Sequence, residues 1–345
     1  TGEFGDSARF RGCRPYNVPM AFRPFRTALV LGGGGARGLA HLGVLTALSE
    51  EGLAPDLIVG TSFGAIVGGS FALEPDAGAL RSRFLELVSD EAVASLERMF
   101  DDPDEGEARD GWRSRLAEWI GAARKVVLWN RTILARSVVD GVLVGRIIER
   151  LVGTAAFSNL AIPFYAVAFD LNAGQDVVIG DGRLGAALRA SSAIPGVFAP
   201  VESGSALLVD GAVFQELPVV AARQLGADFV LAVDVGPESD SRKPSSGAEV
   251  LQRVMALRGR RFREESRTLA DVVVQPAVAG IHWSEFSRIG ECHVAGVAAV
   301  RESLPAIRSG LRRARYRSLL RRLAPAAARV EITRIEAVAE EAREE

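Results

Sequence analysis

Short apolar runs alternate with longer stretches of helical periodicity along most of this 345-residue chain. The runs have the length and composition of strands buried on both faces, and the clearest lie at 27–31, 55–59, 163–169 and 229–234. After the first run, Leu42, Leu45 and Leu48 recur at helical spacing. This alternation predicts an α/β fold with three layers, in which a mainly parallel central sheet lies between two layers of helices.

Changes in the pattern divide the chain into an arm, a main domain and an extension. Residues 1–26 form an N-terminal arm rich in Arg, Pro and Phe, without a clear period. The main domain covers 27–312, and 313–345 are predicted to form a helical C-terminal extension. Within the main domain, 76–152 is mostly helical and rich in Arg and Glu, which predicts an insertion that caps the site.

One helical face of this insertion carries Trp112, Trp119 and Val127, with arginines nearby in the sequence. Tryptophan and basic residues on an amphipathic helix suit a membrane interface or an acyl-chain groove. The same pattern suits a cap helix packed on the core. Both interpretations stay open at the level of sequence.

The first apolar run leads directly into the segment GGGGARG at 32–38. Glycines allow positive φ and close approach to the backbone, and N–H groups at a helix start suit an anion. That anion could be the pyrophosphate of a dinucleotide or the oxyanion of an acyl-transfer intermediate, and a tight turn without a ligand also fits. The dinucleotide interpretation lacks its acidic residue, because the second strand ends in Val59 and Gly60.

The second apolar run leads into GTSFG at 60–64, which matches the pattern G-x-S-x-G. Between a strand and a helix, this pattern forms a sharp elbow that presents the serine hydroxyl as a nucleophile. A serine that caps the N-terminus of a helix is the alternative. The neighbouring glycine segment favours Ser62 as a nucleophile, since it could supply the oxyanion hole.

A serine nucleophile needs a base. Asp210 ends an apolar strand and precedes Gly211, but Asp234 also ends a strand, so spacing alone does not choose between the two aspartates. His282 and His293 both follow Asp210, so a Ser-Asp-His triad in the chain order of α/β-hydrolases stays open.

These motifs resemble the patatin-like phospholipases, especially their bacterial members. GGGARG at 33–38, GTSFG at 60–64 and DGA at 210–212 match three sequence blocks of that family in the same order. The segment RASSAIPGVF at 189–198 also resembles the family's stretch before the third block. The resemblance covers residues 27–300.

The resemblance implies a lipid acyl hydrolase of the phospholipase A or lysophospholipase type. Its catalytic dyad would be Ser62 as nucleophile and Asp210 as base, without a histidine. The reaction would pass through an acyl-enzyme and use no cofactor or metal. The expected substrate is a phospholipid or lysophospholipid.

By the same resemblance, the backbone of Gly33, Gly34 and Gly35 forms the oxyanion hole. Arg37 would stabilise that loop or help to hold substrate phosphate. One departure stands out, because the Asn-rich stretch that many members carry after the third block is replaced here by Gln and Glu216. Glu216 therefore places a charge near the expected site.

Composition narrows the partners and the compartment. With 41 basic and 43 acidic residues, the formal net charge is −2, which argues against a dedicated nucleic-acid binder. Cys13 and Cys292 form neither a metal motif nor a disulfide framework, which favours a reducing compartment. No apolar run is long enough to span a membrane. We therefore expect a cytoplasmic protein. Peripheral membrane contact and the oligomeric state stay open. A non-hydrolytic protein that binds a nucleotide or a lipid also stays open as an alternative function.

Overall fold

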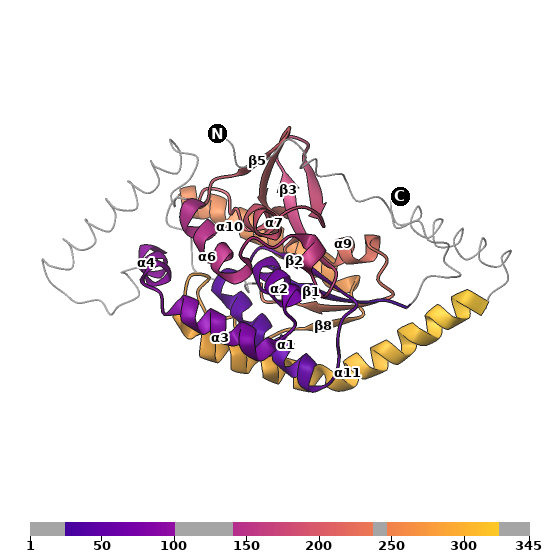
Figure 1. The fold of residues 1–345 in the computed structure, drawn as a ribbon. Coiled ribbons are helices and arrows are strands. Elements are labelled where there is room, and N and C mark those ends of the chain that lie inside the picture. The colour runs from indigo at the N-terminus through magenta and orange to yellow at the C-terminus, as the bar shows by residue number, and fades with distance from the viewer. Residues whose placement is uncertain (1–24, 101–140, 237–246, 324–345) are drawn as a thin grey trace, which may run out of the picture.

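The apolar runs form one mixed sheet in the computed structural model, which describes residues 25–100, 141–236 and 247–323 (Figure 1). The strands follow the order β5-β6-β3-β2-β1-β7-β8, and β4 pairs with β3 off this path. Their bounds are β1 (Thr27–Leu31), β2 (Leu57–Thr61), β3 (Phe164–Asp170), β4 (Gln175–Ile179), β5 (Val201–Ser203), β6 (Ala206–Asp210), β7 (Phe229–Val233) and β8 (Val272–Val274). β3, β2, β1, β7 and β8 pair parallel with one another. β4 and β6 each pair antiparallel with β3, and β5 pairs antiparallel with β6.

Helices cover both faces of this sheet. The α-helices within the described residues are α1 (Ala40–Glu50), α2 (Phe63–Leu73), α3 (Ala77–Val88), α4 (Glu91–Phe100), α6 (Gly141–Val152), α7 (Leu184–Ser191), α8 (Ala212–Gln215), α9 (Val219–Gln224), α10 (Gly247–Thr268) and α11 (Ile289–Leu323). Short 3₁₀ turns are η2 (Gly35–Leu39), η4 (Phe157–Asn159) and η5 (Phe286–Arg288).

The alternation of side chains along β1 shows how the layers form. Leu29 and Leu31 belong to a buried cluster that includes residues of α1, α2 and α11. Ala28 and Val30 point to the opposite face and join a second cluster with residues of α9. The predicted three-layer α/β/α fold with a mainly parallel sheet is therefore confirmed.

Two short elements were not predicted. β5 has three residues and α8 has four, so neither contains enough repeats for a period to be recognised. β5 extends the antiparallel edge by pairing with β6. α8 matters more for function, because it begins two residues after Asp210.

The described parts of the predicted insertion are helices that pack on the main domain. Leu80, Phe84 and Leu87 of α3 and Leu151 of α6 are buried in the same cluster as α1 and α2. The role of 76–152 as a cap stays a prediction. The face with Trp112, Trp119 and Val127 lies outside the described residues.

The longest described helix, α11, covers one face of the sheet and then extends beyond it. It continues without a break across 312–313, where the sequence predicted the C-terminal extension to begin. In Figure 1 its final turns, coloured yellow, reach away from the sheet. Within the described ranges, every helix is too short or too polar to cross a bilayer.

α1 and α11 approach each other closely through two glycines. A Cβ on Gly43 of α1 would lie 2.0 Å from the carbonyl oxygen of His293, and one on Gly296 of α11 would lie 2.1 Å from that of Ala40. Neither contact leaves space for a methyl group, so both helices depend on glycine where they cross.

We expect Gly43→Ala to lower the free energy of unfolding by about 2 kcal/mol or more, because the helices must move apart. Chemical denaturation measures the change. Gly145→Ala in α6 is the matched control, since a Cβ there meets nothing within 4 Å. The control should raise stability by about 0.5–1 kcal/mol through helix propensity. Equal effects at the two positions would contradict this account of the helix crossing.

Candidate active site

β2 and β6 end next to each other on one edge of β3, although they lie far apart in the sequence. Thr61, the last residue of β2, pairs with Val167, and Asp210, the last residue of β6, pairs with Ala168. β4 pairs with these same residues of β3, so it occupies the opposite edge. Since Ser62 follows Thr61 directly, the register brings Ser62 and Asp210 together.

The two side chains are in direct contact. The Ser62 hydroxyl donates a hydrogen bond to Asp210 Oδ2 over 2.6 Å. Both residues are buried, with 6% and 2% of their surfaces exposed. The structure thus selects Asp210 over Asp234 as the neighbour of Ser62.

Ser62 occupies a sharp turn between β2 and α2. Its φ of 56° and ψ of −128° are unfavourable for an L-residue. Within the described residues, no other non-glycine residue has a positive φ. Gly64 allows the turn, because a Cβ there would lie 2.3 Å from the carbonyl oxygen of Leu31. This strand, turn and helix are the context that GTSFG predicts for a serine nucleophile.

Burial controls the acidity of Asp210. Loss of solvation is the largest cause that raises its pKa, and the negative charge of Glu216 adds to it, whereas hydrogen bonds from the Ser62 hydroxyl and the Ala212 N–H oppose it. The resulting pKa is about 7. The Ala212 N–H donates to Oδ1 over 2.8 Å, so each carboxylate oxygen has a fixed donor. A carboxyl with such a pKa can accept and release a proton near neutral pH.

Ser191 supports the turn from the opposite side, and sequence reasoning gave it no role. Its hydroxyl accepts from the Ser62 N–H over 3.0 Å and donates to the Val167 carbonyl over 2.6 Å. It thereby links the turn to β3. The segment 189–198 resembles the family in sequence, but only the fold shows which of its serines makes this bridge.

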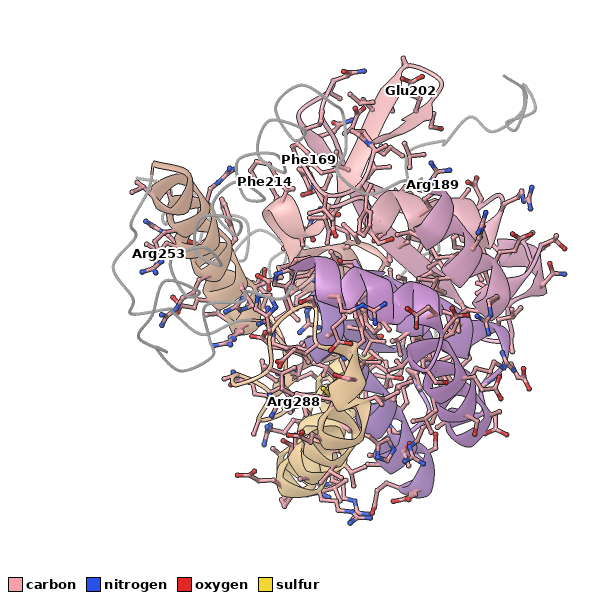
Figure 2. The ribbon with its side chains drawn as sticks, turned by 90° about the vertical axis from the view of Figure 1, so that its left-hand side faces the viewer. Phe169, Arg189, Glu202, Phe214, Arg253 and Arg288 are labelled. Atoms are coloured by element: carbon pink, nitrogen blue, oxygen red, sulfur yellow. The ribbon has the colours of Figure 1, made fainter. Side chains whose placement is uncertain are left out.

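An aromatic cluster ties α10 to the helix that follows Asp210. Phe214 of α8 stacks on Phe169 of β3 with ring centroids 4.4 Å apart, and Figure 2 shows the two residues together. Phe262 of α10 lies 5.8 Å from Phe214, and the Arg258 guanidinium lies 4.0 Å above the Phe214 ring. These aromatic contacts pack β3, α8 and α10 against one another.

Hydrogen bonds hold the start of the glycine segment. The Gly32 N–H donates to the carbonyl of Val233, and the Gly33 N–H donates to that of Glu216 over 2.8 Å. His41 Nε2 lies 2.8 Å from the Gly32 carbonyl. Burial lowers the pKa of His41 to about 4, so this ring is neutral and Nε2 carries the proton.

These contacts bear on the expected oxyanion hole. Gly33 lies against Ser62, because a Cβ on it would be 3.2 Å from Ser62 Cβ. Its N–H is already used by Glu216, however, and so is not available as a donor in this structure. Gly34 and Gly35 come next, and among the described residues no protein acceptor is recorded for either N–H.

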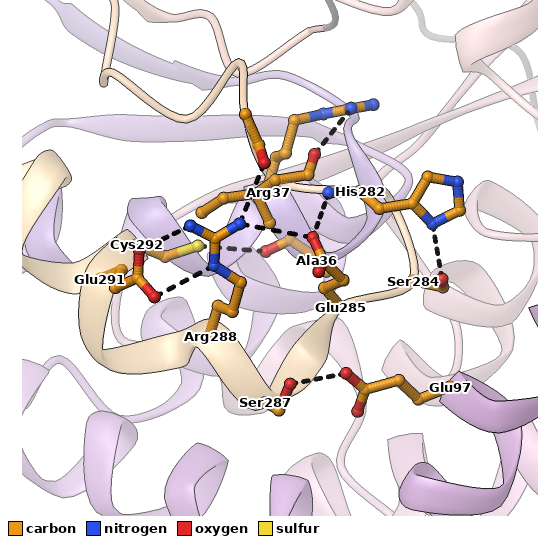
Figure 3. Close-up of polar contacts among 12 residues, drawn as sticks. Ala36, Arg37, Glu97, His282, Ser284, Glu285, Ser287, Arg288, Glu291 and Cys292 are labelled. Atoms are coloured by element: carbon orange, nitrogen blue, oxygen red, sulfur yellow. Dashed lines mark hydrogen bonds and ion pairs between the residues drawn. The ribbon is translucent and has the colours of Figure 1, made fainter. Parts of the chain in front are cut away.

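Arg37 holds the glycine segment against the loop before α11. Its Nη1 donates to the carbonyl of Ile281 over 3.2 Å (Figure 3). The Ala36 N–H donates to the carbonyl of Trp283 over 2.7 Å. Burial lowers the pKa of Arg37, and the charge of Glu216 opposes this effect. Of the two roles expected for Arg37, these contacts favour stabilisation of the loop.

A buried ion network surrounds Glu216. Arg263 of α10 is 4% exposed, and its Nη1 lies 2.8 Å from the Glu216 carboxylate. Its Nε lies 3.4 Å from Asp234, which also pairs with Arg267. Burial raises the pKa of Glu216, and Arg263 opposes that change. The sequence placed a charge here but did not reveal its partner, which lies 47 positions away.

His282 and His293 form hydrogen bonds with residues other than Ser62 and Asp210. His282 Nδ1 lies 2.7 Å from Ser284 Oγ (Figure 3), and His293 Nε2 lies 3.2 Å from Thr46 Oγ1. Within the described residues, no cluster of three His, Cys, Asp or Glu side chains could hold a metal ion. The geometry therefore brings together two groups that can move a proton, Ser62 and Asp210.

The patatin-like phospholipase family model matches residues 29–223, which is more than half of the chain. The chain belongs to the patatin-like phospholipase family. The match includes the glycine segment, the Ser62 turn and Asp210. The family resemblance inferred from the motifs is confirmed.

Relatives of this patatin-like chain are longer proteins. An uncharacterized NTE family protein of Mycobacterium tuberculosis is 37% identical over 235 residues, which are 67% of this chain and 56% of the relative. Patatin-like phospholipase domain-containing protein 6 of Homo sapiens is 32% identical over 218 residues, 62% of this chain and 14% of that protein. The chain thus spans about half of the mycobacterial relative.

Solved structures show weaker likeness. VipD from Legionella pneumophila has a TM-score of 0.40 at 14% identity, with 81% of this chain and 67% of that chain covered. The type III effector ExoU has a TM-score of 0.33 at 19% identity, with 93% and 64% covered.

The buried Asp210 makes the stability of this patatin-like chain depend on pH. Its pKa is raised from 3.8 to about 7 on folding. The stability that protonated Asp210 contributes is therefore fully present below the pKa of the unfolded chain, 3.8, and is lost as the pH rises through the folded pKa of about 7. Relative to Asp210→Asn, the free energy of unfolding of the wild type should fall by a few kcal/mol between these pH values. Urea denaturation across pH measures this difference, and parallel profiles for the two proteins would contradict it.

Proposed function

We propose that this chain hydrolyses carboxylic esters of lipids through a Ser62–Asp210 dyad. The observation that carries the proposal is the 2.6 Å hydrogen bond from the Ser62 hydroxyl to the Asp210 carboxylate. The buried setting and the raised pKa of Asp210 support its role as a base. Membership of the patatin-like phospholipase family supports a lipid ester as substrate.

In the first half of the reaction, Ser62 Oγ attacks the ester carbonyl carbon. Its proton moves along the existing hydrogen bond to Asp210 Oδ2. The tetrahedral intermediate then collapses, and Asp210 returns the proton to the departing alcohol oxygen. An acyl-enzyme on Ser62 remains. In the second half, Asp210 accepts a proton from water, which attacks the acyl carbonyl. When this intermediate collapses, the bond to Ser62 Oγ breaks, Asp210 returns the proton to that oxygen, and the fatty acid leaves.

The oxyanion of each intermediate needs donors close to Ser62. We assign this role to the N–H groups of Gly34 and Gly35, since that of Gly33 is used by Glu216. Gly35 has a φ of 58° and starts η2, so the segment turns at this point. Fixed N–H donors of this kind contribute about 3–4 kcal/mol each to transition-state stabilisation.

A phospholipid or lysophospholipid is the proposed substrate, cleaved in the manner of a phospholipase A or lysophospholipase. A Ser-Asp-His triad finds no support, because His282 and His293 contact Ser284 and Thr46 instead. A non-hydrolytic binding role leaves the strained backbone of Ser62 without a function. Labelling of Ser62 by a fluorophosphonate probe separates hydrolysis from simple binding.

Substitutions in the dyad test the roles of its members. Ser62→Ala and Asp210→Asn should each reduce hydrolysis of lysophospholipid by about three orders of magnitude or more, because one removes the nucleophile and the other its base. The double variant should be little worse than either single one, since the two residues act as a unit. Steady-state kinetics with mass-spectrometric detection of released fatty acid measures these losses.

The histidines provide matched controls for the dyad. His282→Ala and His293→Ala should keep most of the activity, because neither residue contacts Ser62 or Asp210. An active Asp210→Asn variant would refute the assignment of the base. So would a folded histidine variant that is as impaired as Ser62→Ala.

The pH dependence of the rate reports on the base. Because Asp210 must be ionised to accept a proton, kcat/KM should fall below a pH of about 7. Glu216→Gln removes a negative charge that raises the pKa of Asp210. It should therefore move this acidic limb to lower pH.

A soluble short-chain ester assayed from pH 5 to 9 gives both profiles, since the range spans about two units on each side of the expected pKa. Glu265→Gln is the control, because Glu265 is exposed and pairs with Arg261 on α10. A limb that stays in place in Glu216→Gln would show that the charge of Glu216 does not influence the base.

A further inference from the structure

α10 presents an apolar stripe to solvent. Val250, Val254 and Leu257 are 48%, 55% and 50% exposed. Their spacing of four and three residues places them on one side of the helix. Arg261 falls on the same line, and its side chain is 84% exposed. We call these four residues the α10 face.

Arginines surround the α10 face in the sequence. Between 250 and 263 the sequence contains five arginines and no acidic residue, whereas the whole chain has a net charge of −2. Arg253, Arg258 and Arg260 flank the stripe, as their positions on the helix require. Glu249 precedes the stripe directly. Arg260 and Arg261 pair with Glu264 and Glu265 in the next turn, and Arg263, on the buried side, pairs with Glu216 and Asp234.

The α10 face lies at the end of the sheet that holds the candidate active site. Arg263 contacts Asp234, directly after the carboxyl end of β7, and Arg258 lies over Phe214, directly after the Asp210 loop. From 263 back to 250 the helix rises about 20 Å. Figure 2 shows Arg253 on the part of α10 that stands out from the body of the molecule.

We propose that the α10 face docks on an anionic lipid bilayer next to the candidate active site. A helix with an apolar stripe between arginines inserts its apolar side chains among the acyl chains and pairs its cations with anionic head groups. The proposal rests on the proposed function, because a lipid hydrolase must bring its site to the bilayer.

A second copy of the chain fits this face less well. Two copies related by a two-fold axis would place arginines opposite arginines, which repel each other. Three apolar side chains also cover far less than the roughly 800 Å² per partner that a stable protein interface needs. An anionic bilayer attracts the arginines, and it can accept three apolar side chains without a large protein interface.

α11 provides a matched control. Its last turns are also basic and expose Leu319 and Leu320, 52% and 48%. They lie at the opposite end of the sheet, because Arg317 pairs with Asp271 just before β8 and Gly310 packs on Phe229 at the start of β7. Docking through α11 would turn the candidate active site away from the bilayer.

Vesicle flotation of the full chain tests the proposal. All proteins carry Ser62→Ala, so that lipid is not consumed and binding is read independently of hydrolysis. Vesicles contain phosphatidylcholine alone or phosphatidylcholine with phosphatidylglycerol. The triple change Val250→Ser, Val254→Ser and Leu257→Ser should weaken binding to the anionic vesicles by about tenfold or more. Leu319→Ser with Leu320→Ser should bind like the parent.

Arginine substitutions on α10 and α11 test the contribution of charge to vesicle binding. Arg260→Gln with Arg261→Gln should weaken binding, and Arg312→Gln with Arg313→Gln on α11 should not. Higher salt should weaken binding of the parent protein. Thermal melts confirm that each exposed-site variant is folded.

Several results would overturn the proposal. These are absence of binding to anionic vesicles, equal binding to vesicles of phosphatidylcholine alone, and loss of binding in the α11 variants rather than the α10 variants. A parent dimer that becomes monomeric in the α10 triple variant, measured by sedimentation, would assign the face to a second copy instead. Failure of the proposed hydrolysis would appear separately, as an inactive wild type that still binds vesicles.

Discussion

β2 and β6 reach the same edge of β3 from opposite directions, and they stop at consecutive residues of it, Val167 and Ala168. This register determines where Ser62 and Asp210 lie, because each follows from the end of its strand. A shift of either strand by two residues would move one side chain by about 7 Å and separate the pair. The proposed chemistry therefore depends on strand pairing before it depends on any side chain.

Around this pair, every neighbouring segment is held by a specific contact. Ser191 bridges the Ser62 turn to β3, and the carbonyl of Glu216 accepts from Gly33. Arg263 of α10 forms an ion pair with the Glu216 carboxylate. In this setting the Asp210 carboxyl is buried with a raised pKa and still has hydrogen bonds to both oxygens. Such preorganisation is what a proton acceptor in a low-polarity site requires.

The same elements connect the site to the surface. α10 carries Arg263 on its buried side and the α10 face on its exposed side, so one helix both supports the glycine segment and borders solvent. The cluster of Phe169, Phe214 and Phe262 joins this helix to α8 and β3. A lipid surface that contacts α10 would thus meet the protein close to Asp210, whereas α11 ends on the other side of the sheet.

The layered α/β fold can be predicted from the amino-acid sequence, because buried strands and amphipathic helices have recognisable hydrophobic periods. The sequence also determined the serine turn, since G-x-S-x-G reflects a local steric need that Gly64 satisfies at short range. Three-dimensional contacts were needed to place Asp210 rather than Asp234 beside Ser62 and to pair the Gly33 N–H with the Glu216 carbonyl. They also identified Ser191 and Arg263 as residues that hold these segments. Those facts depend on strand register and on contacts between residues 47 to 183 positions apart, which no local pattern encodes.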